Sequence, residues 1–134
     1  MKLEDYPVEV LLGLKKAIDG EEKFLQWFLK NGFPELAAFA SAVRGSEEAY
    51  DWLMSHNYKH FAALDAAIDG NKSAYKWLLD KKLNIMLIFA DACQQKPEAI
   101  AWLNSQKLEI FTLLAKTIHT LRYNQTWDYH KRHF

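Results

Sequence analysis

The side chains in this sequence that are capable of chemistry are few and scattered. His130 and His133 have the i, i+3 spacing that lets two imidazoles on one helix face share a metal ion. No cysteine or third histidine lies near them in the sequence. His56 and His60 are also one helical turn apart, but they flank a predicted turn between helices. We therefore predict no metal site.

Two acids and one thiol are the remaining candidates for catalysis. Asp19 and Asp69 each precede a glycine, and paired carboxylates do acid–base work or bind a cation. Two helical repeats would hold these two acids roughly 20 Å apart, so we interpret both as solvated helix ends. Cys93, the only cysteine, falls in an aliphatic column and is interpreted as a buried, inert thiol. With no catalytic spacing and no glycine-rich phosphate loop, the sequence predicts no enzyme and no cofactor.

The spacing of the tryptophans indicates the elements that hold these residues. Tryptophan recurs every 25 residues, at Trp27, Trp52, Trp77, Trp102 and Trp127. Glycine recurs with the same step at Gly20, Gly45 and Gly70. A period of this length marks arrays of stacked structural repeats. The interpretation of the Trp column is structural: each indole packs between adjacent repeats, with its N–H bonded to a turn carbonyl.

Each repeat is predicted to contain two helices. In the third copy, apolar residues from Phe61 to Ile68 share one helix face. Gly70 follows as a left-handed residue that ends this helix, and Asn71 is a suitable N-cap for the next one. Proline is favoured in the first turn of a helix, and three prolines are predicted to open helices: Pro7, Pro34 and Pro97.

The fold prediction is one all-α domain over residues 1–134, a right-handed α–α superhelix or solenoid. It has about five antiparallel helix pairs, about ten helices, stacked as a stubby rod about 40–50 Å long. Residues 1–10 form a cap that begins with mostly polar residues, and the last copy loses its apolar second helix. The predicted repeats are 11–35, 36–60, 61–85, 86–110 and 111–134.

Composition fits this prediction. Half of the 134 residues are hydrophobic, and 17 basic residues balance 17 acidic ones, so bulk charge points to neither nucleic acid nor membrane. No apolar stretch is long enough to span a bilayer. The acidic N-terminal residues argue against a signal peptide, so we expect a cytoplasmic protein.

The segment Leu64–Gly70 followed by Ala74–Leu79 resembles the helix pair of an ankyrin repeat, and the pattern recurs in four copies over about residues 11–110. The Thr-Pro-Leu-His opening of that family is absent, and the period is 25 residues instead of 33. The chain is thus similar to a compact ankyrin-like or HEAT-like helical repeat. This resemblance implies protein–protein binding.

Charge is distributed unevenly along the chain. Residues 1–67 hold seven basic and eleven acidic residues, a net charge of −4, whereas residues 68–134 hold ten and six, a net charge of +4. Three interpretations remain open: drift in a solvated surface, head-to-tail self-association, and a basic C-terminal end that meets an acidic partner.

The predicted function is a protein–protein interaction scaffold that holds a peptide or partner helix in a groove along its first or second helices. The alternative is a nucleic-acid-binding repeat protein that uses the basic C-terminal half. The candidate partner-binding residues are Lys116, Arg122, Tyr123, Tyr129, Lys131 and Arg132.

Overall fold

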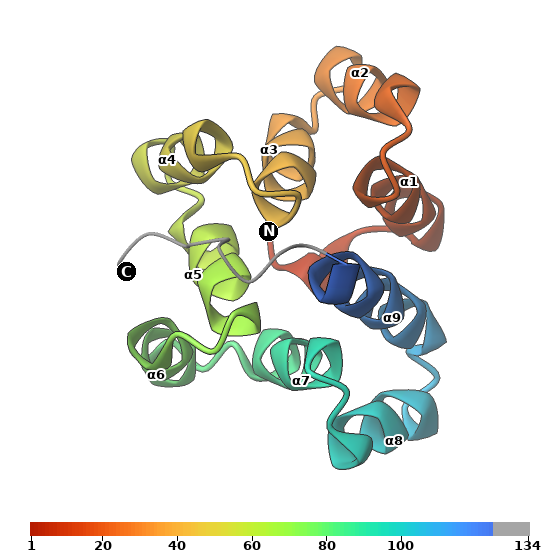
Figure 1. Ribbon diagram of the computed structural model, residues 1–134, viewed down its shortest axis with the longest axis vertical. Helices are drawn as coiled ribbons and strands as arrows, with labels where there is room; N and C mark the ends of the chain where they lie inside the picture. The colour runs from red at the N-terminus through yellow and green to blue at the C-terminus, as the bar shows by residue number, and fades with distance from the viewer. Residues whose placement is uncertain (125–134) are drawn as a thin grey trace.

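The computed structural model describes residues 1–124 and is all-α over that range, without a strand (Figure 1). In the fifth copy, the last helix continues past Thr120, which stands at the glycine-column position of the expected turn, and the rest of that copy lies outside the described residues. The elements are η1 (Leu3–Asp5, a 3₁₀ helix), α1 (Val8–Ile18), α2 (Glu22–Lys30), α3 (Pro34–Val43), α4 (Glu47–Ser55), α5 (Lys59–Ile68), α6 (Lys72–Asp80), α7 (Asn84–Cys93), α8 (Pro97–Ser105) and α9 (Glu109–Asn124).

The helices keep the 25-residue step of the sequence. From α3 onward, helix pairs begin at residues 34, 59 and 84, and α9 begins at 109, two residues before each predicted repeat boundary. Asn71 caps α6, since its Oδ1 accepts the N–H of Ala74 at 2.9 Å. Pro34 and Pro97 occupy the first turns of α3 and α8, and Pro7 is the N-cap of α1.

Each turn between helices contains one residue in the left-handed conformation. The predicted glycine column has this backbone, with a φ of 88° at Gly70, and Gln95 adopts it at 62° in the fourth copy. Gly70 N–H and Asn71 N–H donate to the carbonyls of Ala67 and Ala66, the paired hydrogen bonds that close a helix end. A second left-handed column, which was not predicted, follows the even-numbered helices at Gly32, Asn57, Lys82 and Lys107.

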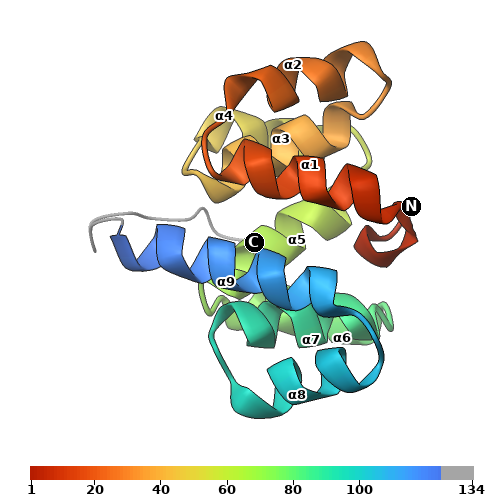
Figure 2. The ribbon, with the colours of Figure 1, turned by 90° about the vertical axis from the view of Figure 1, so that its right-hand side faces the viewer.

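The helices form two shells (Figures 1 and 2). The odd-numbered helices are the inner shell, in which each helix contacts the next, and α1 also contacts α9. Each of α2, α4, α6 and α8 packs on the outside, against the inner helix before it and the inner helix after it. The inner helices therefore close into a ring, and the expected open rod with two separate ends is wrong.

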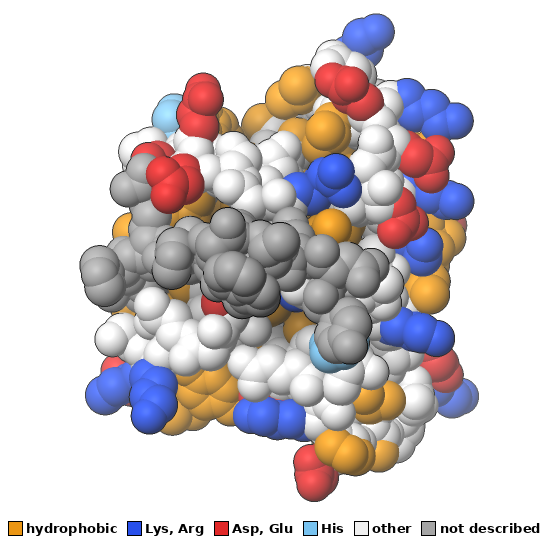
Figure 3. All heavy atoms as spheres, viewed as in Figure 1, with side chains coloured by type: hydrophobic (Ala, Val, Ile, Leu, Met, Phe, Trp, Pro, Cys, Tyr) orange, Lys and Arg blue, Asp and Glu red, His pale blue; other side chains and the backbone are white. Residues whose placement is uncertain are grey.

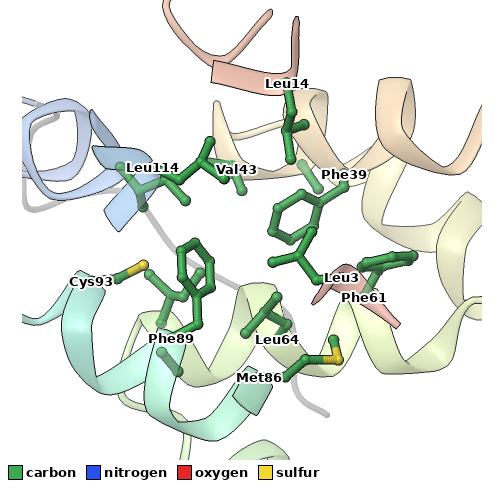
Figure 4. Packing of buried hydrophobic residues seen from close by; sticks show 14 of the residues in the cluster. Leu3, Leu14, Phe39, Val43, Phe61, Leu64, Met86, Phe89, Cys93 and Leu114 are labelled. Atoms are coloured by element: carbon green, nitrogen blue, oxygen red, sulfur yellow. The ribbon is translucent and has the colours of Figure 1, made fainter. Parts of the chain in front are cut away.

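The core fills the centre of this ring (Figure 4). Aromatic and aliphatic side chains of the inner helices meet there, among them Phe39, Phe61, Leu64 and Phe89, all at most 1% exposed. Burying a side chain of this size stabilises the fold by about 1.5–3 kcal/mol. The outer helices contribute the residue that follows each tryptophan, and all four of these are fully buried: Phe28, Leu53, Leu78 and Leu103.

The N-terminal segment belongs to the core instead of forming a polar cap. Leu3 and Tyr6 are 1% and 4% exposed, and Leu3 reaches the ring centre (Figure 4). The Tyr6 hydroxyl donates to Glu35 Oε2 at 2.6 Å. Burial, and then this hydrogen bond to a carboxylate, raise the pKa of Tyr6 well above its usual value. The segment thus closes one opening of the ring.

Candidate interaction surface

Polar side chains close the C-terminal ends of the inner helices. Arg44 Nη1 donates to the carbonyl of Ile18 at 2.8 Å, and Gln94 Nε2 donates to that of Ile68 at 3.3 Å. His119 Nδ1 lies 3.2 Å from the carbonyl of Cys93, the same contact one repeat later. Each donor comes from one repeat and each carbonyl from the repeat before it. This column therefore joins successive inner helices at one face of the ring.

Asp69 occupies the same column and, as an acceptor, cannot donate to the carbonyl of Val43. Arg122 of α9 makes that contact across the ring, with Nε 3.2 Å from the Val43 carbonyl. Its Nη2 lies 2.7 Å from Oδ1 of the fully buried Asp65, and its Nη1 pairs with Asp69. The guanidinium thus ties the last inner helix to the second and third repeats.

This arrangement revises two predictions. Asp19 pairs with Lys15 at 2.7 Å in an exposed i, i+4 contact, as a solvated helix end should. Asp69, with a side chain 22% exposed, is instead part of the Arg122 ion pair. Arg122 was predicted to contact a partner, but its side chain is only 13% exposed and its contacts are internal.

Of the other predicted partner-binding residues, the structure describes the side chain of Lys116 alone. Lys116 is exposed on α9, beside a shallow concavity of about 440 Å³ at the seam between α1 and α9. Tyr123 lies in α9, but its side chain is outside the described part. Tyr129, Lys131 and Arg132 lie outside the described residues.

The described residues that were considered for catalysis or metal binding are buried or contact neighbouring protein groups. Cys93 is 3% exposed, and burial raises the pKa of its thiol well above the usual value. His56 stacks on Trp52 with 4.3 Å between ring centroids, whereas His60 Nε2 lies 2.9 Å from the carbonyl of Met1. Within residues 1–124, no group of three His, Cys, Asp or Glu side chains is placed to hold a metal ion. His130 and His133 lie outside the described residues.

Four tryptophans lie on the outer helices α2, α4, α6 and α8, and Trp127 lies outside the described residues. Trp27 stacks on Phe33 at 5.9 Å, and Trp52 stacks on Tyr58 at 5.7 Å, in each case the residue that precedes the next inner helix. Each of these contacts lies within one predicted repeat, so packing of the indoles between adjacent repeats stays a prediction, as does the indole N–H bond. Trp27 nevertheless keeps 45% of its surface exposed.

A groove of about 550 Å³ lies between α2 and α4 and is floored by α3; it is here called the α2–α4 groove. Figure 3 shows the molecule hollowed there, with apolar side chains along the hollow. Leu29, at its edge, is 55% exposed, and Glu48 is the only charged residue among those that line it. The lining consists of Leu25, Gln26, Leu29, Pro34, Ala37, Ala38, Ser41, Ser46, Glu48, Ala49 and Trp52.

A related groove of about 390 Å³, here called the α6–α7 groove, lies fifty residues further along the chain. Five of its lining residues are the repeat equivalents of α2–α4 groove residues: Tyr75, Lys76, Leu79, Asp91 and Lys96 replace Leu25, Gln26, Leu29, Ser41 and Ser46. The two grooves therefore share a position in the fold but differ in chemistry.

None of the helices in residues 1–124 combines the length and hydrophobicity needed to cross a bilayer.

Comparison with protein-family models, curated proteins and solved structures finds no match to this chain. The likeness to ankyrin and HEAT repeats therefore rests on sequence pattern and helical content.

Proposed function

We propose that this protein is a non-catalytic interaction scaffold that binds the apolar face of a partner helix in the α2–α4 groove. The frame is the predicted right-handed superhelix of antiparallel helix pairs, closed by the contact between α1 and α9. The observation that carries the proposal is an open, apolar groove beside Leu29, a leucine left 55% exposed. We place this activity in the cytoplasm.

The shape of the groove favours a helix as its occupant. Two outer helices form its walls and an inner helix its floor, the setting in which an amphipathic helix lays down apolar residues spaced i, i+3, i+4 and i+7. Small side chains on the floor, Ala38 and Ser41, leave room for larger anchors. Trp52 and Leu25 offer apolar surface on the two walls.

Charge defines the partner further. Helix α4 contains Glu47, Glu48 and Asp51, all exposed, and no basic residue. Figure 3 shows acidic side chains over this helix. Complementary charges speed association and select partners. The expected occupant is therefore an amphipathic helix with basic residues on either side of its apolar stripe.

The test uses a model amphipathic helix with leucines at i, i+3, i+4 and i+7 and lysines elsewhere, its binding followed by fluorescence anisotropy. Leu29→Ser should weaken binding at least about tenfold, because it removes an apolar contact that the peptide would bury. Leu79→Ser is the matched control, since Leu79 is the repeat equivalent of Leu29 and is 54% exposed. Equal loss in both variants, or no binding by the unmodified protein, would contradict the proposal.

Nucleic-acid binding through the basic second half is the alternative, favoured by the exposed Lys116, next to which the first half adds Lys15 and Arg44 at the α1–α9 seam. We favour the scaffold because the guanidinium of Arg122, expected to contact phosphates, is engaged inside the ring. A salt-dependent shift assay with duplex DNA separates the two, since phosphate contacts weaken steeply with added salt.

A further inference from the structure

Residues 50 positions apart in the repeat can be compared between the α6–α7 groove and the α2–α4 groove. Buried columns repeat because the packing demands it, but an exposed position is free to vary. In the α6–α7 groove, Lys76 and Lys96 stand where the α2–α4 groove has Gln26 and Ser46. Lys72, which also lines the α6–α7 groove, stands where α2 has Glu22. The second groove thus has a basic rim that the first lacks.

The lysine side chains on this rim reach into solvent. Those of Lys76 and Lys96 are 73% and 52% exposed. Each has one internal carboxylate, Asp80 at 3.0 Å and Asp91 at 3.2 Å. Exposed pairs of this kind are worth at most about 1 kcal/mol, so an incoming carboxylate can share or replace them at small cost.

Other residues of the α6–α7 groove add apolar and polar surface. Leu79 is 54% exposed, and Figure 3 shows apolar side chains between basic ones over α6 and α7. The Tyr75 hydroxyl donates to Asp91 Oδ2 at 3.2 Å, which fixes the ring along one wall. Gln94, whose Nε2 donates to the carbonyl of Ile68, also lines the groove. The groove therefore combines three ammonium groups with an apolar contact surface.

We propose that the α6–α7 groove is a second binding site, which takes an acidic amphipathic peptide segment. Its carboxylates would meet Lys72, Lys76 and Lys96, and an apolar side chain would cover Leu79. A nucleic-acid backbone fits less well, because an exposed leucine contributes nothing to phosphate contacts. This site is separate from the α2–α4 groove and does not depend on it.

The experiment uses a labelled peptide of alternating glutamate and leucine, titrated at physiological ionic strength. The double variant Lys76→Gln/Lys96→Ser gives this groove the residues of the α2–α4 groove and should weaken binding about tenfold. The matched control, Lys23→Gln/Lys30→Gln on α2, changes the net charge equally and should bind as the unmodified protein does. Leu79→Ser should also weaken the acidic peptide, whereas Leu29→Ser should leave it unchanged.

Several outcomes overturn the proposal. Equal weakening by both lysine pairs would mean that the peptide responds to overall charge and not to this groove. An all-glutamate peptide that binds as tightly as the amphipathic one would remove the role of Leu79. Duplex DNA that displaces the peptide, and whose own binding is weakened by Lys76→Gln/Lys96→Ser, would assign the groove to nucleic acid. Because the grooves have separate variants and probes, failure here is distinguishable from failure of the scaffold proposal.

Discussion

Replacing Arg122 with methionine should destabilise the protein strongly, because Arg122 neutralises a carboxylate that water does not reach. Asp65 is fully buried, and its Oδ1 lies 2.7 Å from Arg122 Nη2. Removing one partner of a buried ion pair costs about 3–5 kcal/mol, mostly for the charge left behind. The carbonyl of Val43 also loses the donor at 3.2 Å, a contribution of about 1 kcal/mol.

The destabilisation by Arg122→Met is large compared with the total unfolding free energy of the protein. A chain of this length has a total unfolding free energy of about 7–20 kcal/mol, so Arg122→Met would remove a large share of it. In urea unfolding followed by circular dichroism, the midpoint should fall by about 2 M. Lys15→Met is the control: it breaks the exposed pair with Asp19, and should cost less than about 1 kcal/mol.

A second variant separates the ion pair from general damage to α9. In Asp65→Leu/Arg122→Met both charges are gone, and replacing a buried pair with apolar residues is often neutral. The double variant should therefore recover most of the stability that Arg122→Met loses. If Arg122→Met unfolds at the same urea concentration as Lys15→Met, or the double variant is no better than the single one, Arg122 does not hold the ring closed.

Three further predictions concern His60, Cys93 and a pair of left-handed turn residues. Burial lowers the pKa of His60 below 6.5, so the unfolded chain binds more protons than the folded protein as the pH drops below 6.5. The stability that His60 contributes above pH 6.5 should therefore be lost as the pH falls through its folded-state pKa. Between pH 7.5 and 5, the unfolding free energy of His60→Gln should change less than that of the unmodified protein. The Cys93 thiol should react with a disulfide reagent only as fast as the protein opens, so urea should accelerate labelling, and rapid labelling of native protein would contradict its burial. Lys82→Gly should raise the unfolding free energy by about 0.5–1 kcal/mol, because the φ of Lys82 is 59°. Gly20→Ala should lower it by about 1–2 kcal/mol, since the φ of Gly20 is 101° and a Cβ would lie 3.2 Å from Arg44 Nη1. The urea midpoints of the two variants should therefore shift in opposite directions.

Local structure was predictable because its signals are local. The tryptophan period gave the 25-residue step, and Gly70 and Asn71 marked the end of one helix and the cap of the next. The second left-handed column was missed because Lys82 and Lys107 carry no preference for that backbone. Only Gly32 and Asn57 gave a signal for it, at two of the four positions.

Closure of the ring could not be predicted from one repeat. Each repeat is rotated slightly relative to the one before it, and these small rotations add up along the chain. Their sum decides whether the stack of helix pairs stays open or closes into a ring. The one sequence signal was indirect: Asp69 interrupts a column that supplies donors to the preceding repeat at Arg44 and Gln94, which left the Val43 carbonyl without a donor from this column. Nothing local identified that donor as Arg122.

Closure also explains why binding surfaces form on the outside of the molecule and not in its centre. The inner helices converge and fill the ring with side chains, so no concave inner face is left for a partner. The outer helices lie at a larger radius, and each packs mainly on inner helices instead of on its outer neighbours. Grooves therefore open between repeats, and leucines that would be buried in a tighter stack, Leu29 and Leu79, stay exposed beside them. The same geometry that satisfies the core leaves the apolar edges on which both binding proposals depend.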